Sequence, residues 1–441
     1  MRITLISFLY FFYLLPSAGA IPVFPTAKGY GTDTVAGSGR NLRKPQSTIV
    51  RVINLSDDGP GSLRACAESV KGPRTCVFET SGVINLRKPL KIDKPYLTIA
   101  GQTAPEPGLM LRGAGIRVAT HDVLIQHLRI RVGDAMSGPD PRTRDGISIG
   151  ADSKSSYNVV IDHCSVSWAI DENLSTWYAD TRDITISNTL VAEGLDNSIH
   201  PKGPHSKGVM FGDGSQRISF HHNLVANHVE RNPYLKPGTS VEVVNNVVYG
   251  WGSKGGWMLA NLSDSSRIGD PVRLNFVGNY YKPGPHSVHE EALFAKPAVE
   301  TSRIFAKANI GPTRMQDVGN EWLISNLPEK PFRLSTPAVR PTGIVERKPE
   351  DSYQFVLNNA GAYPAFRDKV DARVVQEVRE GKGGIKDCVV GCAKSAGGWP
   401  SLARHYRSLT VPSDPLHVTD SGYTRLELWL QEFSKSVEAR D

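Results

Sequence analysis

A short segment repeats through the middle of this chain, and the repeat constrains the fold more than any other feature. Each copy has apolar residues two apart, then one or two polar residues, then another short apolar step. The copies start at Val159 ("VVIDHCSVSW"), Ile184 ("ITISNTLVAEG"), Ile218 ("ISFHHNLVANH"), Val241 ("VEVVNNVVYGWG") and Arg273 ("RLNFVGNYY"), so the starts are 25, 34, 23 and 32 residues apart. Such alternation predicts short strands. A period of roughly 23 residues without intervening helices predicts an all-β fold, a right-handed single-stranded parallel β-helix.

Alignment of the copies places polar residues in one column. Asn223, Asn246 and Asn279 share this column, and Cys164 and Thr189 occupy it in the two earlier copies. Stacked asparagine side chains can hydrogen-bond to one another and satisfy backbone groups at a corner of each coil. The longer gaps are expected to be loops on one side, where such a fold usually places its site. The alternative fold, a β-sandwich, needs hairpin turn signals, and these are scarce.

The first 20 residues indicate the compartment. Arg2 precedes an apolar run, and small residues end the segment at Ala20. This pattern predicts a signal peptide over residues 1–20 and a secreted protein without a membrane anchor, because the run is too short to span comfortably. Sequons for glycosylation begin at three asparagines: Asn54, Asn173 and Asn261.

Five cysteines fit a secreted chain. Cys66 and Cys76 lie ten residues apart, and Cys388 and Cys392 lie four apart, so we expect each pair to form a disulfide. Cys164 stands in an alternating apolar segment, which predicts a buried thiol and not a nucleophile.

The chain divides into regions of different character. We expect the β-helix over residues 21–300, with "GPGSLRACAESV" as a short helix covering its open end. Residues 301–441 hold more proline and charge and less repetition, which predicts irregular and helical segments packed on the β-helix. In the last of these, Leu426, Leu430 and Phe433 share one helix face.

A formal charge of +7 suits a polyanionic partner. The chain has no dense Lys/Arg run and no nucleic-acid module, so an acidic polysaccharide is preferred over nucleic acid. We expect a monomer.

Several ordered motifs resemble one family. They are "NLSDDGPGSLRACAE", "YLTIAGQTAPEPG", "IRVGD", "RDGISI", "VVIDHCSVSW", "FHHNLVANHVERNP" and "YTRLELWL". Over about Gly29 to Glu432 the chain resembles the secreted pectate lyases of polysaccharide lyase family 1, in the branch with a DHCSxSWxxDE motif. The resemblance implies Ca²⁺-dependent eliminative cleavage of (1→4)-α-D-galacturonan, giving 4,5-unsaturated oligogalacturonides.

The resemblance also implies which cations act. Arg231, in "ERNPYLKPG", falls at the position of the family's proton acceptor. Crowded cations and a low-dielectric cleft favour the neutral form that an arginine base requires. Lys236 stands where the family has a second arginine and keeps only the charge, so we expect it to bind substrate. Lys207 matches a substrate-binding lysine, although the neighbouring Lys202 is an alternative.

Calcium requires oxygen ligands from carboxylates. Asp145 in "RDGISI" matches the family's first aspartate, and Asp171 and Glu172 supply the next carboxylate. A further carboxylate is expected four residues after Glu172, where Thr176 stands, and Asp134 is a spare candidate. We expect this site to be weaker, or to be completed by substrate carboxylates.

The histidines give less specific signals. Strand alternation predicts that Asp162 and His163 lie on opposite faces and have a structural role. By the same argument, His221 and His222 point apart and do not share one ion. Others are expected at the surface or as donors to sugar hydroxyls: His200, His205 and His228.

Two alternatives to the pectate lyase prediction stay open. A pectin lyase acting on methyl-esterified chains should lack Asp145 and Glu172 and have an aromatic cleft. A catalytically dead β-helix should bind polygalacturonate without releasing unsaturated product.

Overall fold

The computed structural model describes most of the chain. It covers residues 21–42, 47–152, 154–252, 258–259, 267–288, 291–295 and 299–438. The predicted signal peptide and the sequon at Asn261 lie outside these ranges.

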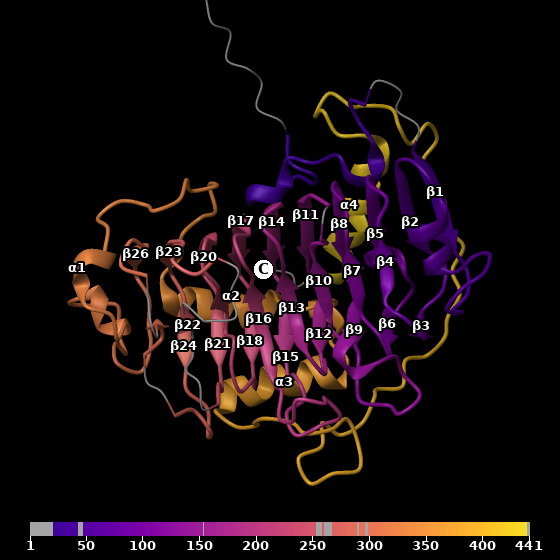
Figure 1. Cartoon of the computed structure of the whole chain (residues 1–441). Helices are drawn as coiled ribbons and strands as arrows, with labels where there is room; N and C mark the ends of the chain where they lie inside the picture. The colour runs from indigo at the N-terminus through magenta and orange to yellow at the C-terminus, as the bar shows by residue number, and fades with distance from the viewer. Residues whose placement is uncertain are drawn as a thin grey trace, which may run out of the picture.

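Three sheets stack coil upon coil, and neighbouring strands within each sheet run parallel (Figure 1). Sheet 1 contains β1 (Thr48–Val52), β2 (Arg74–Phe78), β5 (Leu97–Ala100), β8 (Val123–Gln126), β11 (Ser156–Asp162), β14 (Thr181–Ser187), β17 (Gln216–His221), β20 (Ser240–Val244), β23 (Arg273–Val277) and β26 (Arg303–Lys307). Sheet 2 contains β3 (Gly82–Asn85), β6 (Leu109–Arg112), β9 (Arg129–Arg131), β12 (Ser165–Ser167), β15 (Leu190–Ala192), β18 (Leu224–Ala226), β21 (Val247–Tyr249) and β24 (Tyr280–Lys282). Sheet 3 contains β4 (Leu90–Ile92), β7 (Ile116–Val118), β10 (Ile147–Ile149), β13 (Glu172–Thr176), β16 (Lys207–Phe211), β19 (Tyr234–Leu235), β22 (Met258–Leu259) and β25 (Phe294–Ala295). From β2 to β25 each coil passes from sheet 1 to sheet 2 to sheet 3, which confirms the predicted parallel β-helix.

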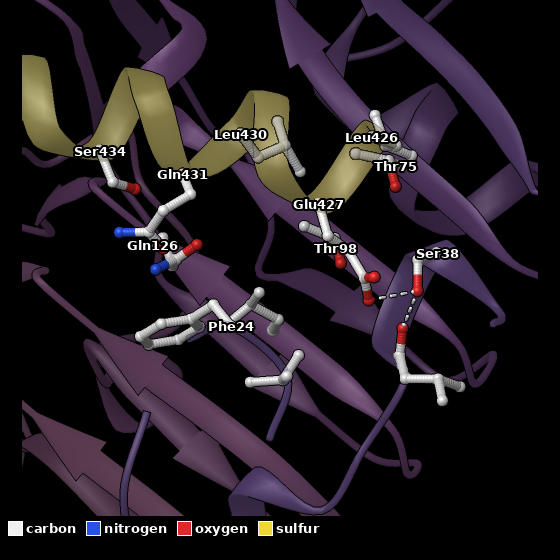
Figure 2. Close-up of a pocket in the computed structure, with 13 residues that line it drawn as sticks. Phe24, Ser38, Thr75, Thr98, Gln126, Leu426, Glu427, Leu430, Gln431 and Ser434 are labelled. Atoms are coloured by element: carbon white, nitrogen blue, oxygen red, sulfur yellow. Dashed lines mark hydrogen bonds between the residues drawn. The ribbon is translucent and has the colours of Figure 1, made fainter. Parts of the chain in front are cut away.

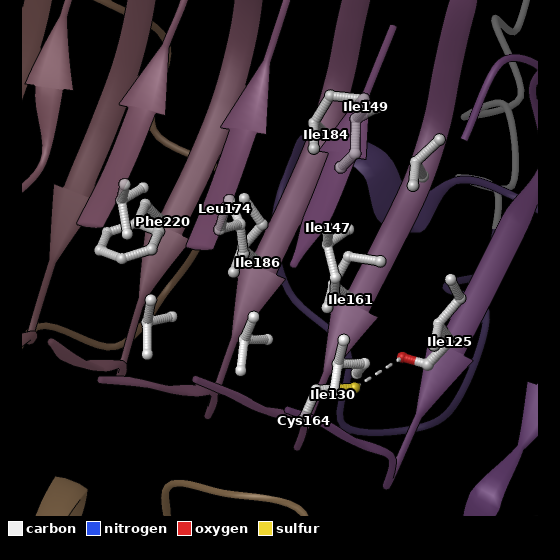
Figure 3. Close-up of a cluster of buried hydrophobic side chains, with 14 of the residues drawn as sticks. Ile125, Ile130, Ile147, Ile149, Ile161, Cys164, Leu174, Ile184, Ile186 and Phe220 are labelled. Carbon is white, nitrogen blue, oxygen red and sulfur yellow. Dashed lines mark hydrogen bonds between the residues drawn. The ribbon is translucent and has the colours of Figure 1, made fainter. Parts of the chain in front are cut away.

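The interior consists of stacked apolar side chains. Figure 3 shows Ile125, Ile161, Ile186 and Phe220 on four neighbouring strands of sheet 1. The strand register pairs each of them with the next, so every coil contributes to the same apolar row. Burial of each such side chain contributes about 1.5–3 kcal/mol. The two-residue alternation of the sequence therefore forms the core.

The predicted asparagine column is present at the corner between sheets 1 and 2. Asn246 Oδ1 accepts from Asn223 N at 2.9 Å and Nδ2 at 3.0 Å, and Asn279 Oδ1 receives the same pair of bonds from Asn246 at 2.9 and 3.0 Å. Asn309 extends the column, and the buried Glu321 ends it by accepting from Asn309 N at 3.1 Å and Nδ2 at 2.8 Å. Sequence analysis identified the middle of this ladder but not its last two members.

Helical segments are few and short. The α-helices are α1 (Glu329–Phe332), α2 (Pro349–Asn359), α3 (Lys369–Glu380) and α4 (Arg425–Val437). The remaining turns are η1 (Tyr30–Thr32), η2 (Ala36–Ser38), η3 (Ala65–Ser69), η4 (Gly101–Thr103), η5 (Pro141–Thr143), η6 (Glu321–Ile324) and η7 (Pro364–Phe366). The expected N-terminal helix is the short π-helical η3, whose Cys66 and Ala67 join the β-helix core.

The C-terminal helices pack on the sheets. Residues of α2 and α3, including Val356 and Val374, contact apolar side chains of sheet 2. The face of α4 that was predicted apolar packs on sheet 1, with Leu426 and Leu430 fully or almost fully buried. Figure 2 shows α4 above a small hollow, with Ser38 Oγ donating to Glu427 Oε1 at 2.7 Å.

The cysteines pair as predicted. Disulfides join Cys66 to Cys76 and Cys388 to Cys392. Cys164 is a free, fully buried thiol, and burial raises its pKa to about 12, so a nucleophilic role is excluded.

Two further surface expectations can be compared with the structure. Asn173 is fully buried and donates to Ala192 O at 3.0 Å, so its sequon is closed to glycosylation in the folded chain. Among the described residues, no helix has the length and apolar character needed to cross a membrane.

Candidate active site

A cleft of about 350 Å³ lies along sheet 3 at strands β7, β10 and β13. Its lining mixes carboxylates, cations and aromatic rings. These residues include Arg117, Arg142, Asp145, Ser148, Asp171, Glu172, Trp177 and Tyr178.

Parallel register brings three predicted carboxylates together in this cleft. Ile147 of β10 pairs with Leu174 of β13, so Asp145 and Glu172, each two residues earlier, lie side by side. Asp171 directly precedes Glu172. One ligand atom from each of the three carboxylates lies within 4.8 Å of the other two. The three residues can therefore act on one ion.

Asp145 carries the clearest electrostatic signature. Burial, followed by repulsion from Asp171, raises its pKa to about 7, although Arg117 and Arg231 oppose the shift. Its Oδ1 atom is buried and has no hydrogen-bond partner among the described residues. A buried carboxylate oxygen without a donor, beside two more carboxylates, matches the oxygen-rich ligand set that a hard cation such as Ca²⁺ prefers.

Arg231 reaches the same group of carboxylates from the coil of β19, which is separated from the coil of Glu172 by the coil that carries β16. It follows the bridge that pairs Glu230 with Lys207 and adopts a left-handed conformation with φ of 69°. Its Nη1 atom contacts Glu172 Oε1 and lies 3.4 Å from Met210 Sδ. The guanidinium therefore lies within reach of a ligand that binds at the carboxylates.

The two lysines are held by carboxylates of their own. Lys207 is buried in register with Glu172 and contacts Glu230. Lys236 lies 3.3 Å from Asp213 Oδ2 and 5.5 Å from the Trp177 ring centroid.

Comparison with known proteins gives the same assignment as the motifs. The chain is 32% identical to the probable pectate lyase C of Aspergillus flavus, over 97% of each chain, and 31% identical to that of Emericella nidulans, over 83% of this chain and 78% of the relative. The chain belongs to the pectate lyase family. Among solved structures, the cedar pollen allergen jun a 1 superposes with a TM-score of 0.53 at 17% identity, covering 76% of this chain and 92% of the allergen. A pectate lyase bound to a hexasaccharide superposes with a TM-score of 0.52 at 13% identity, covering 79% and 100%. No family model matches the chain.

Two sequence positions of this lyase can be placed relative to the cleft. Thr176 pairs with Ile149 and Phe211, both core residues, and is itself fully buried, so it faces the interior and not the cleft. The three carboxylates meet without Thr176, and a weaker site, or one completed by substrate carboxylates, stays a prediction. Asp134 lies 3.4 Å from Val389 N in the C-terminal segment and is not part of the carboxylate group.

Lys202 and Lys207, which the sequence left as alternatives, lie in different surroundings. Lys202 is exposed on the preceding turn, whereas Lys207 begins β16 beside Glu172. Of the two, Lys207 is therefore the one in register with the carboxylate group.

The predicted directions of two polar pairs are wrong. His163 Nδ1 lies 2.9 Å from Asp162 Oδ2, and His221 Nδ1 lies 2.8 Å from His222 Nδ1. His163 and His222 have φ of 47° and 55°, a left-handed conformation that ends the strand and breaks its alternation. Residues adjacent in sequence therefore meet at the corner between sheets 1 and 2.

Of the three histidines expected at the surface or as donors to sugar hydroxyls, His200 and His228 are buried and His205 is partly exposed. His205 Nε2 lies 2.8 Å from Asp171 Oδ1, and the His205 ring stacks on that of the buried His200 at 3.8 Å. His228 is fully buried 2.8 Å from Asn173 Nδ2, and burial lowers its pKa to about 3. His205 thereby orients a carboxylate of the cleft.

Sequence reasoning missed several cleft residues of the lyase. Arg117 is the exposed residue between two buried ones on β7 and pairs with Ser148 of β10. The alternation of the sequence predicts that Arg117 points outward. The register then places it one coil from Asp145. Trp177 and Tyr178 directly follow β13, and no local pattern distinguishes them from ordinary turn residues.

Proposed function

We propose that this lyase cleaves pectate by calcium-dependent elimination, with Arg231 as the proton acceptor and 4,5-unsaturated oligogalacturonides as products. The observation that carries the proposal is the grouping of three carboxylates, Asp145, Asp171 and Glu172, with Arg231 in contact with Glu172. Family membership supports the same reaction class.

The difficult step of this elimination is removal of the C5 proton, because charge develops beside the uronate carboxylate. A bound Ca²⁺ would neutralise that carboxylate and stabilise the developing charge. Asp145, Asp171 and Glu172 would hold the ion, and the unpartnered Oδ1 of Asp145 supports that assignment.

The remaining groups have distinct proposed roles. Arg231 would take the C5 proton as the neutral guanidine, a form favoured by the nearby cations and by release of its contact with Glu172, and the C4–O bond to the leaving sugar would break. Lys207 and Lys236 attract the uronate groups as point charges. The rings of Trp177 and Tyr178 border the cleft and offer surfaces for sugar faces. An extracellular location forms part of the proposal, supported by the predicted signal peptide and the two disulfides.

The test measures the absorbance of unsaturated product from de-esterified polygalacturonate, with and without a chelator. For Arg231→Ala we expect kcat to fall about 10²- to 10⁴-fold, the usual contribution of a general base, with little change in KM. The matched control is Arg217→Ala, which removes an arginine paired with Asp183 on sheet 1.

Each alternative has its own signature in this assay. Full activity of Arg231→Ala would contradict the base assignment. Chelator-resistant activity that prefers methyl-esterified chains would indicate a pectin lyase. Tight binding of polygalacturonate without product would indicate a dead binding protein.

A further inference from the structure

A second group of metal-ligating side chains lies away from the cleft, at the corner between sheets 1 and 2. It comprises His127 after β8, Asp162 and His163 at the end of β11, and Glu438 just past α4. Ligand atoms of the first three lie within 4.8 Å of one another. From this geometry we propose that the group binds one Zn²⁺ ion and fastens the C-terminal helix to the β-helix.

The fold itself assembles the group. Gln126 of β8 pairs with Asp162 of β11, so the residues that follow them, His127 and His163, are adjacent in the stack. Both adopt left-handed backbone conformations, with φ of 56° and 47°, and their rings stack at 5.1 Å. Parallel register thus places two imidazoles side by side, one coil apart.

The distances between ligand atoms approach those of a tetrahedral site. Four ligand atoms that each lie about 2.0–2.1 Å from a tetrahedral ion are separated from one another by roughly 3.3 Å. The observed separations are 2.9 Å from Asp162 Oδ2 to His163 Nδ1, 3.5 Å from His127 Nε2 to Glu438 Oε1, and 3.8 Å from His163 Nδ1 to Glu438 Oε1. Completing the ligand set would also require the two imidazole rings, which lie within 9° of parallel, to rotate so that their lone pairs converge on the ion.

His127 is already oriented as a ligand. Its Nδ1 atom lies 2.7 Å from Ala362 O, a carbonyl that can only accept, so Nδ1 carries a proton and Nε2 is the ring atom that faces the group. His127 is fully buried, and Nε2 has no hydrogen-bond partner among the described residues. A backbone carbonyl that fixes the tautomer of a histidine is the usual support of a metal ligand.

Asp162 has comparable support. Its Oδ1 atom accepts from Ser187 Oγ at 2.7 Å and Asn188 Nδ2 at 3.1 Å, and Oδ2 accepts from Gln126 Nε2 at 3.1 Å. The carboxylate is therefore fixed in orientation before any ion binds. Conserving these bonds would leave one lone pair of Oδ2 for the metal.

Chemistry and access favour zinc over calcium. Two imidazole nitrogens and two carboxylates suit a borderline-soft ion in a four-coordinate site, and the dication balances the two negative charges. A hollow of about 480 Å³ is lined by Asp162, His163 and Glu438 and provides a path for entry. The strand β12 separates this group from Glu172, so the ion would not share the cleft.

The experiment uses the full-length protein, stripped with a chelator, dialysed and titrated with ZnCl₂ by calorimetry. We expect one Zn²⁺ per chain at this group. Zinc at a hundredfold excess over Kd should raise the thermal midpoint by about 3 °C. Glu438→Gln, at a partly exposed position close to the chain end, should fold normally and weaken zinc binding at least tenfold. His163→Gln should abolish binding at this site.

The matched control is His205→Gln, which disrupts a different cluster, that of Asp171, His200 and His205 beside the cleft. It should leave zinc binding at the corner unchanged. If His163→Gln does not fold, the wild type and Glu438→Gln can be compared with Co²⁺ in place of Zn²⁺. The visible absorption band of four-coordinate Co²⁺ should be present in the wild type and weaker in Glu438→Gln. No saturable zinc binding, or binding that is lost in His205→Gln and kept in Glu438→Gln, would overturn the proposal. The group would then be a protonated His163 ion-paired with two carboxylates.

Discussion

At the scale of single residues, the direction of a side chain decides whether its chemistry is available. Thr176 lies on the strand that begins with Glu172, but it shares the inward face of Leu174 and pairs with the core residues Ile149 and Phe211. Its hydroxyl donates to Ser215 Oγ at 3.1 Å, inside the β-helix. A carboxylate at this position would be buried and would not reach the cleft.

The inward direction of the Thr176 side chain can be tested by substitution. Thr176→Asp should lower the free energy of unfolding by about 3 kcal/mol, because it buries a charge without a partner. Chemical denaturation at neutral pH measures the loss, and calorimetric titration with Ca²⁺ should show no gain in affinity. The control Thr176→Val keeps the shape and should cost only about 1 kcal/mol. A stable Thr176→Asp protein with tighter calcium binding would refute the inward orientation.

At the scale of elements, the asparagine ladder holds the coils in register at one corner. Each rung satisfies a buried backbone N–H of the coil before it, and Asn246 Nδ2 also donates to Phe220 O at 2.9 Å. Buried polar groups that lose their partners cost about 1–3 kcal/mol each.

We therefore expect Asn246→Ala to lower the free energy of unfolding by about 3 kcal/mol or more. It removes the acceptor of the Asn223 amide and a donor to the Phe220 carbonyl, both at fully buried residues. The control is Asn358→Ala on the exposed face of α2, which should stay within about 0.5 kcal/mol. Urea denaturation of both proteins makes the comparison, and equal losses would show that the ladder does not bear on stability.

The end of the ladder gives a prediction about pH. Burial raises the pKa of Glu321 above its ordinary 4.5, although Asn309 and Arg314 oppose the shift. A raised pKa in the folded state means that the stability contributed by the protonated form is complete below about pH 4.5 and is lost as the pH rises through the folded-state pKa. Glu321→Gln keeps an acceptor for Asn309 and cannot ionise. Its thermal midpoint should match that of the wild type at pH 4 and exceed it increasingly toward pH 8. A difference in thermal midpoint that narrows with rising pH would contradict the raised pKa of Glu321.

At the scale of the whole molecule, the features predicted from sequence are those that repeat. The alternation around Ile161 and Phe220 defined the strands, and their stacking brought Asp145, Glu172 and Arg231 to one cleft from three coils. The period of the sequence predicts the strands and their stacking, whereas the resemblance to the pectate lyases singled out Asp145, Glu172 and Arg231, and parallel register explains why they meet.

Features that depend on turns and on distant segments could not be predicted in this way. The left-handed conformation of His163 reversed its expected direction, and no periodic pattern encodes it. The contact of His205 with Asp171 depends on the path of a long loop. Arg117 belongs to no motif, but its place in the strand could have been predicted, because it lies in register with Ser148 of the next coil.

The two described ends of the chain meet on sheet 1, and this closure joins the first coils to the last helix. Glu427 of α4 contacts Arg40 Nη1, accepts from Ser38 and closes a capping box with Thr424. Arg40 Nη2 also donates to the carbonyls of Ile21 and Pro22 at 2.7 and 2.8 Å. One buried carboxylate therefore fixes the N-terminal segment and the start of α4 together.

Glu427→Ala should uncouple these two segments. It leaves Arg40, only 2% exposed, as a buried charge without its carboxylate, a change that typically costs about 3–5 kcal/mol. The control Glu432→Ala breaks the exposed pair with Lys435 on the same helix and should cost less than about 1 kcal/mol. Hydrogen exchange should quicken in β2 and β5, which lie beneath α4, while β13 and lyase activity at 25 °C stay unchanged, because the cleft lies on sheet 3. Equal acceleration across all three sheets would mean that the β-helix unfolds as one unit and that the closure stabilises every coil alike.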